Sequence, residues 1–447
     1  MNRIKWVYGA LFAVLTALWL FAEQPWTQSH NFFQLRAIMV DYTGFIAMGA
    51  MSLGMILAIR PVTLEPWLGG LDKSYRLHKW LGITALAAGT VHWLWATGVK
   101  WAVHAGWLER PQRGPRPVIE EPIQRFFMDM SHAAESVGEW SFYIAAVLIL
   151  LALIKWFPYR YFFKTHRIIA VVYLVLVFHA IFLIKFSHWT NPSPIAWVSL
   201  LLMAGGAAGA VLSLTRRIGR QRRALGVVET LHNASDGVLE VGIRLPRDRW
   251  EGHDAGQFAF VSFYDGNGRE AHPFTISSAW KNDGLLRFRV KSLGDYTARL
   301  PATLKVGDRA MVEGPYGCFR FESDQPRQIW VAGGIGITPF LARLEEFIQR
   351  TPAKGAVDLF YCVRNPDEGF VENLEQLAGT VGVTLRVVVD GRDRQLDAEQ
   401  LCAEAPEWKE SSLWFCGPSG FGQALRQGLM SRGFEAKNFH QELFEMR

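Results

Sequence analysis

The sequence contains few cysteines for its length. Four of its 447 residues are cysteine, namely Cys318, Cys362, Cys402 and Cys416, and all of them lie in the second half. They lack the CxxC spacing of a metal site, and their number and position give no sign of a disulfide framework. The pattern predicts reduced thiols in a cytosolic module.

Charged residues are also scarce, at 20% of the chain against 50% hydrophobic residues. This balance is too apolar for an ordinary soluble enzyme and too charged for a chain that lies wholly in a membrane, so we expect a membrane part followed by a soluble part. No internal repeat or low-complexity tract is present. The net charge of +6 does not indicate nucleic-acid binding, because much of it follows the last hydrophobic segment as an arginine cluster, which is a topology signal. The cluster comprises Arg216, Arg217, Arg220, Arg222 and Arg223.

Six apolar segments predict membrane-spanning helices. They cover roughly residues 6–21, 38–59, 78–99, 137–157, 168–186 and 195–214. Lysine and arginine gather before the first span, between the second and third, between the fourth and fifth, and after the sixth, so the positive-inside rule places both termini in the cytoplasm. No small-residue cleavage site follows the first span, which we therefore expect to be retained as a helix.

Two of these spans each contain two histidines. His78 and His92 are 14 residues apart in the third span, and His166 and His179 are 13 apart in the fifth. An ionisable side chain is costly at membrane depth and is by default a functional candidate. At about 1.5 Å per residue, each pair is separated by roughly 20 Å along its helix. Two adjacent helices would then offer one imidazole each at two levels, which suits bis-histidine ligation of two b-type haems.

The positive-inside rule orders the two levels. His78 and His166 would form the cytoplasmic pair, and His92 and His179 the outer pair. The alternative is that each histidine is simply packed and hydrogen-bonded. A spacing of 13 residues also leaves about 140° around a helix, so the fifth span would have to tilt, kink or hold its haems on different flanks. Arg36, near the outer end of the second span, is either a partner of a haem propionate or of the acceptor, or an interfacial snorkelling arginine.

From Leu225 onward, short alternating runs predict a small antiparallel barrel. The run His272, Pro273, Phe274, Thr275, Ile276, Ser277 can lie flat against a flavin ring, with Thr275 or Ser277 hydrogen-bonded to the ring edge. About twenty residues further on, Lys291, Gly294 and Thr297 stand where a strand meets a helix start, a place that favours phosphate. Each string taken alone is also compatible with an ordinary strand turn or helix cap.

After Gln328 the pattern changes to alternating strands and helices, which predicts an α/β sheet. A strand leads into a glycine turn and a helix, where the backbone can approach a pyrophosphate closely; the residues are Gly333, Gly334, Gly336 and Thr338. Cys416, Gly417 and Pro418 follow a later strand. Arg364, just past a strand end, is either a ligand of the 2′-phosphate of NADPH or a surface arginine.

The last residues, FHQELFEMR, contain Glu442 and Phe444. Phe444 either completes a core or covers the flavin face where nicotinamide must later lie, which would make it a gate. Together with Thr275 and Cys416, Glu442 and Phe444 are the candidate catalytic residues of the soluble half.

With these motifs in this order, the chain resembles the ferric reductase and NADPH oxidase superfamily over nearly its whole length. The resemblance implies a six-span transmembrane haem domain at 1–220, an FAD-binding β-barrel domain at 221–326 and an NAD(P)H-binding α/β domain at 327–447. It also implies haem ligation by the four histidines, FAD contacts at 272–275 with Lys291 and Thr297, and nucleotide contacts at 333–338 and 416–418. Arg36 matches an arginine that the oxidases place beside the outer haem. Ala96 stands where eukaryotic oxidases tend to have a histidine, which weakens the case for superoxide production.

The expected activity is electron transfer from cytosolic NAD(P)H through FAD, the inner haem and the outer haem to an external acceptor, with NADPH favoured over NADH because of Arg364. The acceptor is either oxygen, giving superoxide, or a ferric chelate. The sequence shows no N-terminal calcium-binding or partner-recruiting extension, so we expect a bacterial inner-membrane enzyme that needs no obligatory protein partner. Two other readings stay open: a haem and flavin subunit that exchanges electrons with quinone or a periplasmic partner enzyme, and a non-redox transporter whose histidines are coincidental.

Overall fold

The computed structural model describes residues 2–27, 31–109, 121–154, 156–157, 159–190, 193–234, 237–264, 270–349 and 355–442. The chain divides into two compact units. The first comprises essentially residues 1–64 and 73–218, and the second residues 65–72 and 219–446.

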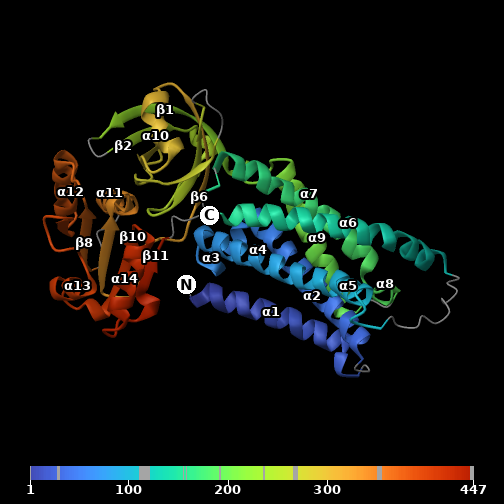
Figure 1. The fold of residues 1–447 in the computed structure, drawn as a ribbon. Helices are drawn as coiled ribbons and strands as arrows, with labels where there is room; N and C mark the ends of the chain where they lie inside the picture. The colour runs from blue at the N-terminus through green and yellow to red at the C-terminus, as the bar shows by residue number, and fades with distance from the viewer. Residues whose placement is uncertain are drawn as a thin grey trace. The chain divides into compact units, whose positions relative to one another are not determined.

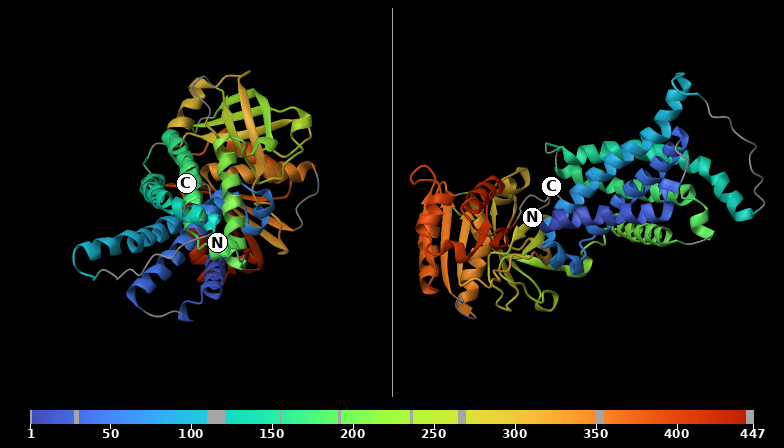
Figure 2. Two further views of the ribbon diagram at one scale, coloured as in Figure 1. Left: turned by 90° about the vertical axis from the view of Figure 1, so that its right-hand side faces the viewer. Right: turned by 90° about the horizontal axis from the view of Figure 1, so that it is seen from below.

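The first unit is a bundle of long helices, which lie side by side in Figures 1 and 2. The helices of more than 20 residues are α1 (Asn2–Glu23), α2 (Phe32–Ala58), α4 (Leu71–Trp93), α6 (Pro122–Leu153), α7 (Tyr159–Leu183) and α9 (Pro194–Leu214). Five of them, all except α4, are long and apolar enough to cross a membrane. Helix α4 begins earlier than its apolar segment, and its first nine residues carry Asp72, Lys73, Arg76 and Lys79, which lower its hydropathy.

Small residues bring these helices close together. A Cβ atom at Gly209 of α9 would lie 2.6 Å from the carbonyl oxygen of Met55 in α2, and one at Gly206 would lie 2.1 Å from the Tyr173 hydroxyl of α7. That hydroxyl is fully buried and is 2.8 Å from the hydroxyl of Ser52. Helices that pack through glycine with a hydrogen bond between them are typical of membrane bundles.

The second unit begins with a six-stranded antiparallel sheet in the order β4-β3-β6-β1-β2-β5. An antiparallel bridge between Ile276 and Phe288, just past β4 and within β5, brings the two edges together and nearly closes the barrel. Alternate side chains of β5 are buried, as expected for a strand with one face on a core. The strands are β1 (Arg223–Asn233), β2 (Val238–Arg244), β3 (Phe258–Phe263), β4 (His272–Thr275), β5 (Leu285–Lys291) and β6 (Arg309–Tyr316), and α10 (Asp295–Thr303) follows β5.

A five-stranded parallel sheet follows, in the order β11-β10-β7-β8-β9. Its strands are β7 (Arg327–Gly333), β8 (Ala356–Val363), β9 (Thr384–Val389), β10 (Ser411–Cys416) and β11 (Phe439–Gln441), and its helices are α11 (Thr338–Gln349), α12 (Glu368–Thr380), α13 (Ala398–Glu404) and α14 (Ser419–Met430). The chain moves from β7 to β8 on one side and returns to β10 on the other. The strand order therefore reverses between β7 and β10, and ligands of such sheets bind at the carboxyl ends of the strands at this point.

Candidate functional site

The four histidines of the bundle form two close pairs, each with one ring from α4 and one from α7 and with ring planes at 70° and 88° to each other. The ring centroids of His78 and His166 are 5.8 Å apart, and those of His92 and His179 are 6.3 Å apart. A metal–nitrogen bond of about 2 Å on either side of one ion would put two facing imidazole centroids roughly 6 Å apart. The spacing of both pairs thus fits an iron held between them, in spite of the 13-residue interval in α7.

Hydrogen bonds orient three of these rings. The Nδ1 atoms of His78, His92 and His179 lie 2.9, 2.9 and 2.7 Å from the backbone oxygens of Gly54, Val40 and Ala134. Because a carbonyl can only accept, each Nδ1 carries the proton and each Nε2 keeps its lone pair for a metal. Nδ1 of His166 is buried with no hydrogen-bond partner among the described residues, and its ring stacks on Phe162.

Glycines make room for the imidazoles. A Cβ atom at Gly138 would lie 1.9 Å from Nδ1 of His179, and one at Gly44 would lie 3.1 Å from the ring of His92. Within the described residues no cluster of three or more histidine, cysteine or acidic side chains is arranged for a metal ion. Two imidazoles at each level, with glycine beside the outer-level rings, fit the two axial positions of a haem, whereas a structural zinc site takes four protein ligands.

Arg36 lies against the chain just past His92. Its Nε and Nη2 donate to the backbone oxygens of Trp95 and Ala96, at 3.0 and 2.9 Å. These two residues belong to a π-helical turn, η3 (Leu94–Gly98), whose widened backbone interrupts the usual hydrogen-bond pattern. Arg36 thus stabilises this turn, an arrangement that neither alternative from the sequence foresaw.

The barrel places the predicted flavin residues on and after β4. Thr275 is buried, and its hydroxyl has no hydrogen-bond partner in the described part of the chain, so it fits a cofactor that supplies one. His272 stacks on Tyr296 with centroids 4.1 Å apart, and burial lowers the pKa of its imidazole, which favours the neutral ring. The amide of Ser277, itself buried, donates to the carbonyl of Arg287, which joins the end of β4 to β5.

The predicted phosphate residues lie where β5 leads into α10. Lys291 is the last residue of β5, and Gly294 immediately precedes the helix. The Thr297 hydroxyl accepts from the amides of Leu293 and Gly294, at 3.0 and 3.1 Å. Thr297 therefore caps its own helix. Binding of a phosphate, as predicted from the sequence, would be a second role of the same side chain.

The two glycine-rich turns of the α/β domain lie in direct contact. A Cβ atom at Gly336 would lie 2.1 Å from the carbonyl oxygen of Cys416, and one at Gly333 would lie 2.7 Å from Pro418. Gly334 has a φ of 55°, a left-handed conformation that glycine adopts without strain. The turn ends at Thr338, whose hydroxyl donates to the carbonyl of Ile335 as α11 begins. A Cβ atom at Gly417 would lie 3.0 Å from Gly333, so both turns form one backbone cradle at the reversal of strand order.

The remaining predicted residues differ in their environment. The thiol of Cys416 is fully buried, which raises its pKa well above the usual value, and the Glu442 carboxylate acts in the same direction. Glu442 is also buried, and its amide contacts the carbonyl of Phe415. Arg364 is 82% exposed and forms a loose ion pair with Asp390, 3.5 Å away. Phe444 lies outside the described residues.

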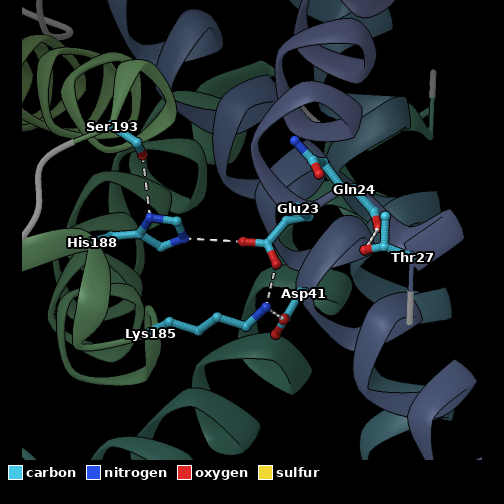
Figure 3. A network of polar contacts seen from close by, with 7 residues as sticks. All are labelled: Glu23, Gln24, Thr27, Asp41, Lys185, His188 and Ser193. Carbon is cyan, nitrogen blue, oxygen red and sulfur yellow. Dashed lines mark hydrogen bonds and ion pairs between the residues drawn. The ribbon is translucent and has the colours of Figure 1, made fainter. Parts of the chain in front are cut away.

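Sequence reasoning missed a polar network between helix ends of the bundle. Glu23, Asp41, Lys185 and His188 come from four different segments and form a chain of contacts, from Asp41 to Lys185, then Glu23, then His188, as Figure 3 shows. The sequence signal was weak, because each residue stands alone at the border of an apolar segment. The ligand-facing glycines were equally hard to find, since glycine is common in membrane helices.

Comparisons with known proteins match each part of the chain to a family. The ferric reductase like transmembrane component matches residues 43–177, an FAD-binding domain matches 226–320, and an oxidoreductase NAD-binding domain matches 330–427.

Individual relatives are more distant. The stachydrine N-demethylase reductase subunit Stc4 of Rhizobium meliloti is 26% identical over 46% of this chain and 62% of its own length. The putative respiratory burst oxidase homolog protein G of Arabidopsis thaliana is 24% identical over 43% of this chain and 24% of its own length. Each match thus spans less than two thirds of the relative. Among solved structures, the FAD/NAD-binding domain of nitric oxide dioxygenase from Vibrio cholerae aligns with 49% of this chain and 97% of its own, at 24% identity and a TM-score of 0.43.

The transmembrane match and the five apolar helices make this a multi-pass membrane protein. The two C-terminal matches add domains for FAD and NAD(P)H, with NAD(P)H as a substrate. The chain is therefore an oxidoreductase with the domain architecture of the ferric reductase and NADPH oxidase superfamily.

Proposed function

We propose that this protein carries electrons from NAD(P)H across a membrane, through FAD and two b-type haems, to an acceptor at the opposite face. The observation that supports the haem path most directly is the close pair of imidazoles at each of two levels, with centroids 5.8 and 6.3 Å apart. In this proposal His78 and His166 hold the inner haem, and His92 and His179 hold the outer one.

The residues of this chain bind and orient the cofactors. The backbone oxygens of Gly54, Val40 and Ala134 hold the protons of three ligand imidazoles, which makes those imidazoles stronger donors. When bound, FAD would accept two electrons as hydride and pass them on singly, and the haems would relay them.

In the soluble half, the hydroxyl of Thr275 would donate to the flavin edge. His272, Pro273 and Phe274 would lie along the cofactor, while Lys291, Gly294 and Thr297 would meet its phosphates. The cradle formed by the two glycine turns would take the pyrophosphate of NAD(P)H beside Cys416. The Cys416 thiol would stay protonated there, because burial raises its pKa, and would serve as a neutral neighbour of the nicotinamide and not as a nucleophile.

The remaining assignments complete the proposal. The charge pattern of the sequence supports both termini in the cytoplasm, and we assign the protein to a bacterial inner membrane as part of the proposal. Arg364 would hold the 2′-phosphate of NADPH, since its guanidinium is exposed beside the end of β8. Phe444 would gate nicotinamide access, so its deletion should speed hydride transfer in stopped-flow measurements, and unchanged kinetics would remove the gate.

Haem binding is tested on the purified full chain by its dithionite-reduced spectrum and by iron porphyrin content. We expect a b-type α band and two haems per polypeptide. His92→Ala or His179→Ala should lower this content to one haem and leave flavin reduction by NADPH intact. His104→Ala, which removes an exposed histidine of α5 (Val99–His104), is the matched control and should keep both haems. A folded wild-type preparation without haem would refute the proposal.

The acceptor is tested separately. Oxygen giving superoxide and a ferric chelate giving ferrous iron both suit an exit at the outer level. Cytochrome c reduction would be followed with and without superoxide dismutase. Inhibition by dismutase would identify oxygen as the acceptor, and insensitivity together with ferrous chelate formation would identify iron.

A further inference from the structure

The polar network in Figure 3 joins four segments at one end of the bundle. Glu23 is the last residue of α1, Asp41 lies in α2, Lys185 follows α7, and His188 belongs to α8 (Ser187–Thr190). The Lys185 ammonium contacts the Glu23 carboxylate and lies 2.9 Å from Asp41. Nε2 of His188 is 3.0 Å from the second oxygen of Glu23, and its Nδ1 is 3.2 Å from the Ser193 hydroxyl.

The network is partly shielded from solvent. The side chains of Glu23 and His188 are 10% and 17% exposed, whereas those of Asp41 and Lys185 are 34% and 46% exposed. Two carboxylates, those of Glu23 and Asp41, share the one ammonium of Lys185. Charges that water screens only partly act over longer distances than surface charges do.

One end of the network leads to a predicted haem ligand. Asp41 directly follows Val40, whose backbone oxygen accepts the Nδ1 proton of His92. The same stretch of α2 contains Gly44, where an added Cβ atom would lie 3.1 Å from the His92 ring. Lys185 lies six residues after His179, on the segment that leaves α7. The ion pair between Asp41 and Lys185 therefore links the backbone that orients one outer ligand to the chain that carries the other.

The carbonyl that orients a ligand at the inner level has different neighbours from the one at the outer level. The carbonyl that orients His78 belongs to Gly54, which is followed by the buried Met55. No comparable group of ion pairs adjoins that carbonyl among the described residues. A perturbation of the network should therefore reach one level and not the other.

We propose that the network of Glu23, Asp41, Lys185 and His188 is a positioning element for His92 that sets the reduction potential of the outer haem. This inference rests on the proposed haem ligation. Negative charge near a haem stabilises its oxidised, more positive form and lowers its potential, while Lys185 offsets part of that effect. A shift of the 40–44 backbone would also change the hydrogen bond at Nδ1 of His92, and with it the donor strength of the imidazole.

The test is an optical redox titration of the purified, haem-loaded full chain at pH 8. The component lost in His92→Ala identifies the outer haem. Asp41→Asn should raise the midpoint potential of that component, Lys185→Met should lower it, and Lys185→Arg should leave it near the wild-type value. The electron paramagnetic resonance g values of the same haem should change in the first two variants, because the ligand ring is reoriented.

Asp129→Asn is the matched control, since it removes an exposed carboxylate of α6 without touching the network. It should shift neither component. The proposal is overturned if Asp41→Asn and Lys185→Met leave both potentials unchanged, if both components shift equally, or if Asp129→Asn has the same effect as Asp41→Asn. Absence of haem from the wild-type chain would instead refute the haem assignment, so the two failures are distinguishable.

Discussion

The glycines beside the paired imidazoles allow a graded test of the proposed haem sites. At Gly138 in α6, an alanine Cβ would lie 1.9 Å from Nδ1, 2.4 Å from Cε1 and 2.6 Å from Cγ of His179. Ordinary carbon contacts begin near 3.5 Å, so the ring would have to retreat by about 1.5 Å. A metal–nitrogen bond of about 2 Å does not survive such a displacement.

The expected loss of haem affinity is the sum of two free-energy costs, one from overpacking and one from a lost hydrogen bond. Overpacking of this kind costs about 1–3 kcal/mol, and the bond from His179 to the Ala134 carbonyl contributes about 1 kcal/mol more. At 1.4 kcal/mol for each factor of ten, Gly138→Ala should weaken haem binding at this level roughly 30- to 700-fold. We expect a purified protein with one haem instead of two.

The controls use the same substitution at other glycines. An alanine Cβ would lie 3.1 Å from the His92 ring at Gly44, 3.8 Å from His78 at Gly54, and more than 4 Å from any described atom outside its own helix backbone at Gly82. Gly44→Ala should therefore alter the spectrum of the outer haem without expelling it, while Gly54→Ala and Gly82→Ala should keep both haems. Haem content by the pyridine haemochrome assay and the α band measure the series. Retention of both haems in Gly138→Ala, or loss of one in Gly54→Ala, would refute the reasoning.

Three further predictions concern the soluble half. Thr275→Val removes a buried hydroxyl that has no partner in the described chain, and it should weaken FAD binding about fivefold, the equivalent of one hydrogen bond, in a fluorescence titration of the apoprotein. Arg364→Ala should raise the KM for NADPH about tenfold and leave that for NADH unchanged, and equal effects on both would identify a surface arginine. Because burial raises the pKa of Cys416, iodoacetamide at pH 8 should label that thiol more than about tenfold more slowly in the folded than in the unfolded protein, as measured by peptide mass spectrometry. Equal labelling rates would show that the thiol is accessible and ionised.

The sequence alone predicted the class of each half and the order of the domains. Local patterns carry this information. Apolar segments of membrane length, alternating runs and a glycine turn between a strand and a helix each depend only on neighbouring residues. The fold class and the oxidoreductase architecture are confirmed by the barrel, the parallel sheet and the family matches. The number of spans was harder to predict. The sequence indicated six, whereas five of the described helices are long and apolar enough to cross a membrane; the exception is α4, which begins with a charged stretch.

The sequence predicted which histidines form each pair, but not how the two rings of a pair come to lie close together. The spacing in α7 left about 140° between His166 and His179, and only the packed helices bring each ring close to its partner. The carbonyl acceptors of Gly54, Val40 and Ala134 are backbone groups, which carry no signal in the sequence.

The sequence by itself determined that an apolar helical part precedes a barrel domain and an α/β domain, and which residues are candidates for cofactors. The tertiary structure decided that Arg36 holds a π-helical turn, that Gly138 gives space to His179, and that Glu23, Asp41 and Lys185 meet. The physical reason is the distance along the chain over which each effect acts. Hydropathy and turn propensity act within about ten residues, whereas these contacts join atoms that are far apart along the chain and become neighbours only when the helices pack.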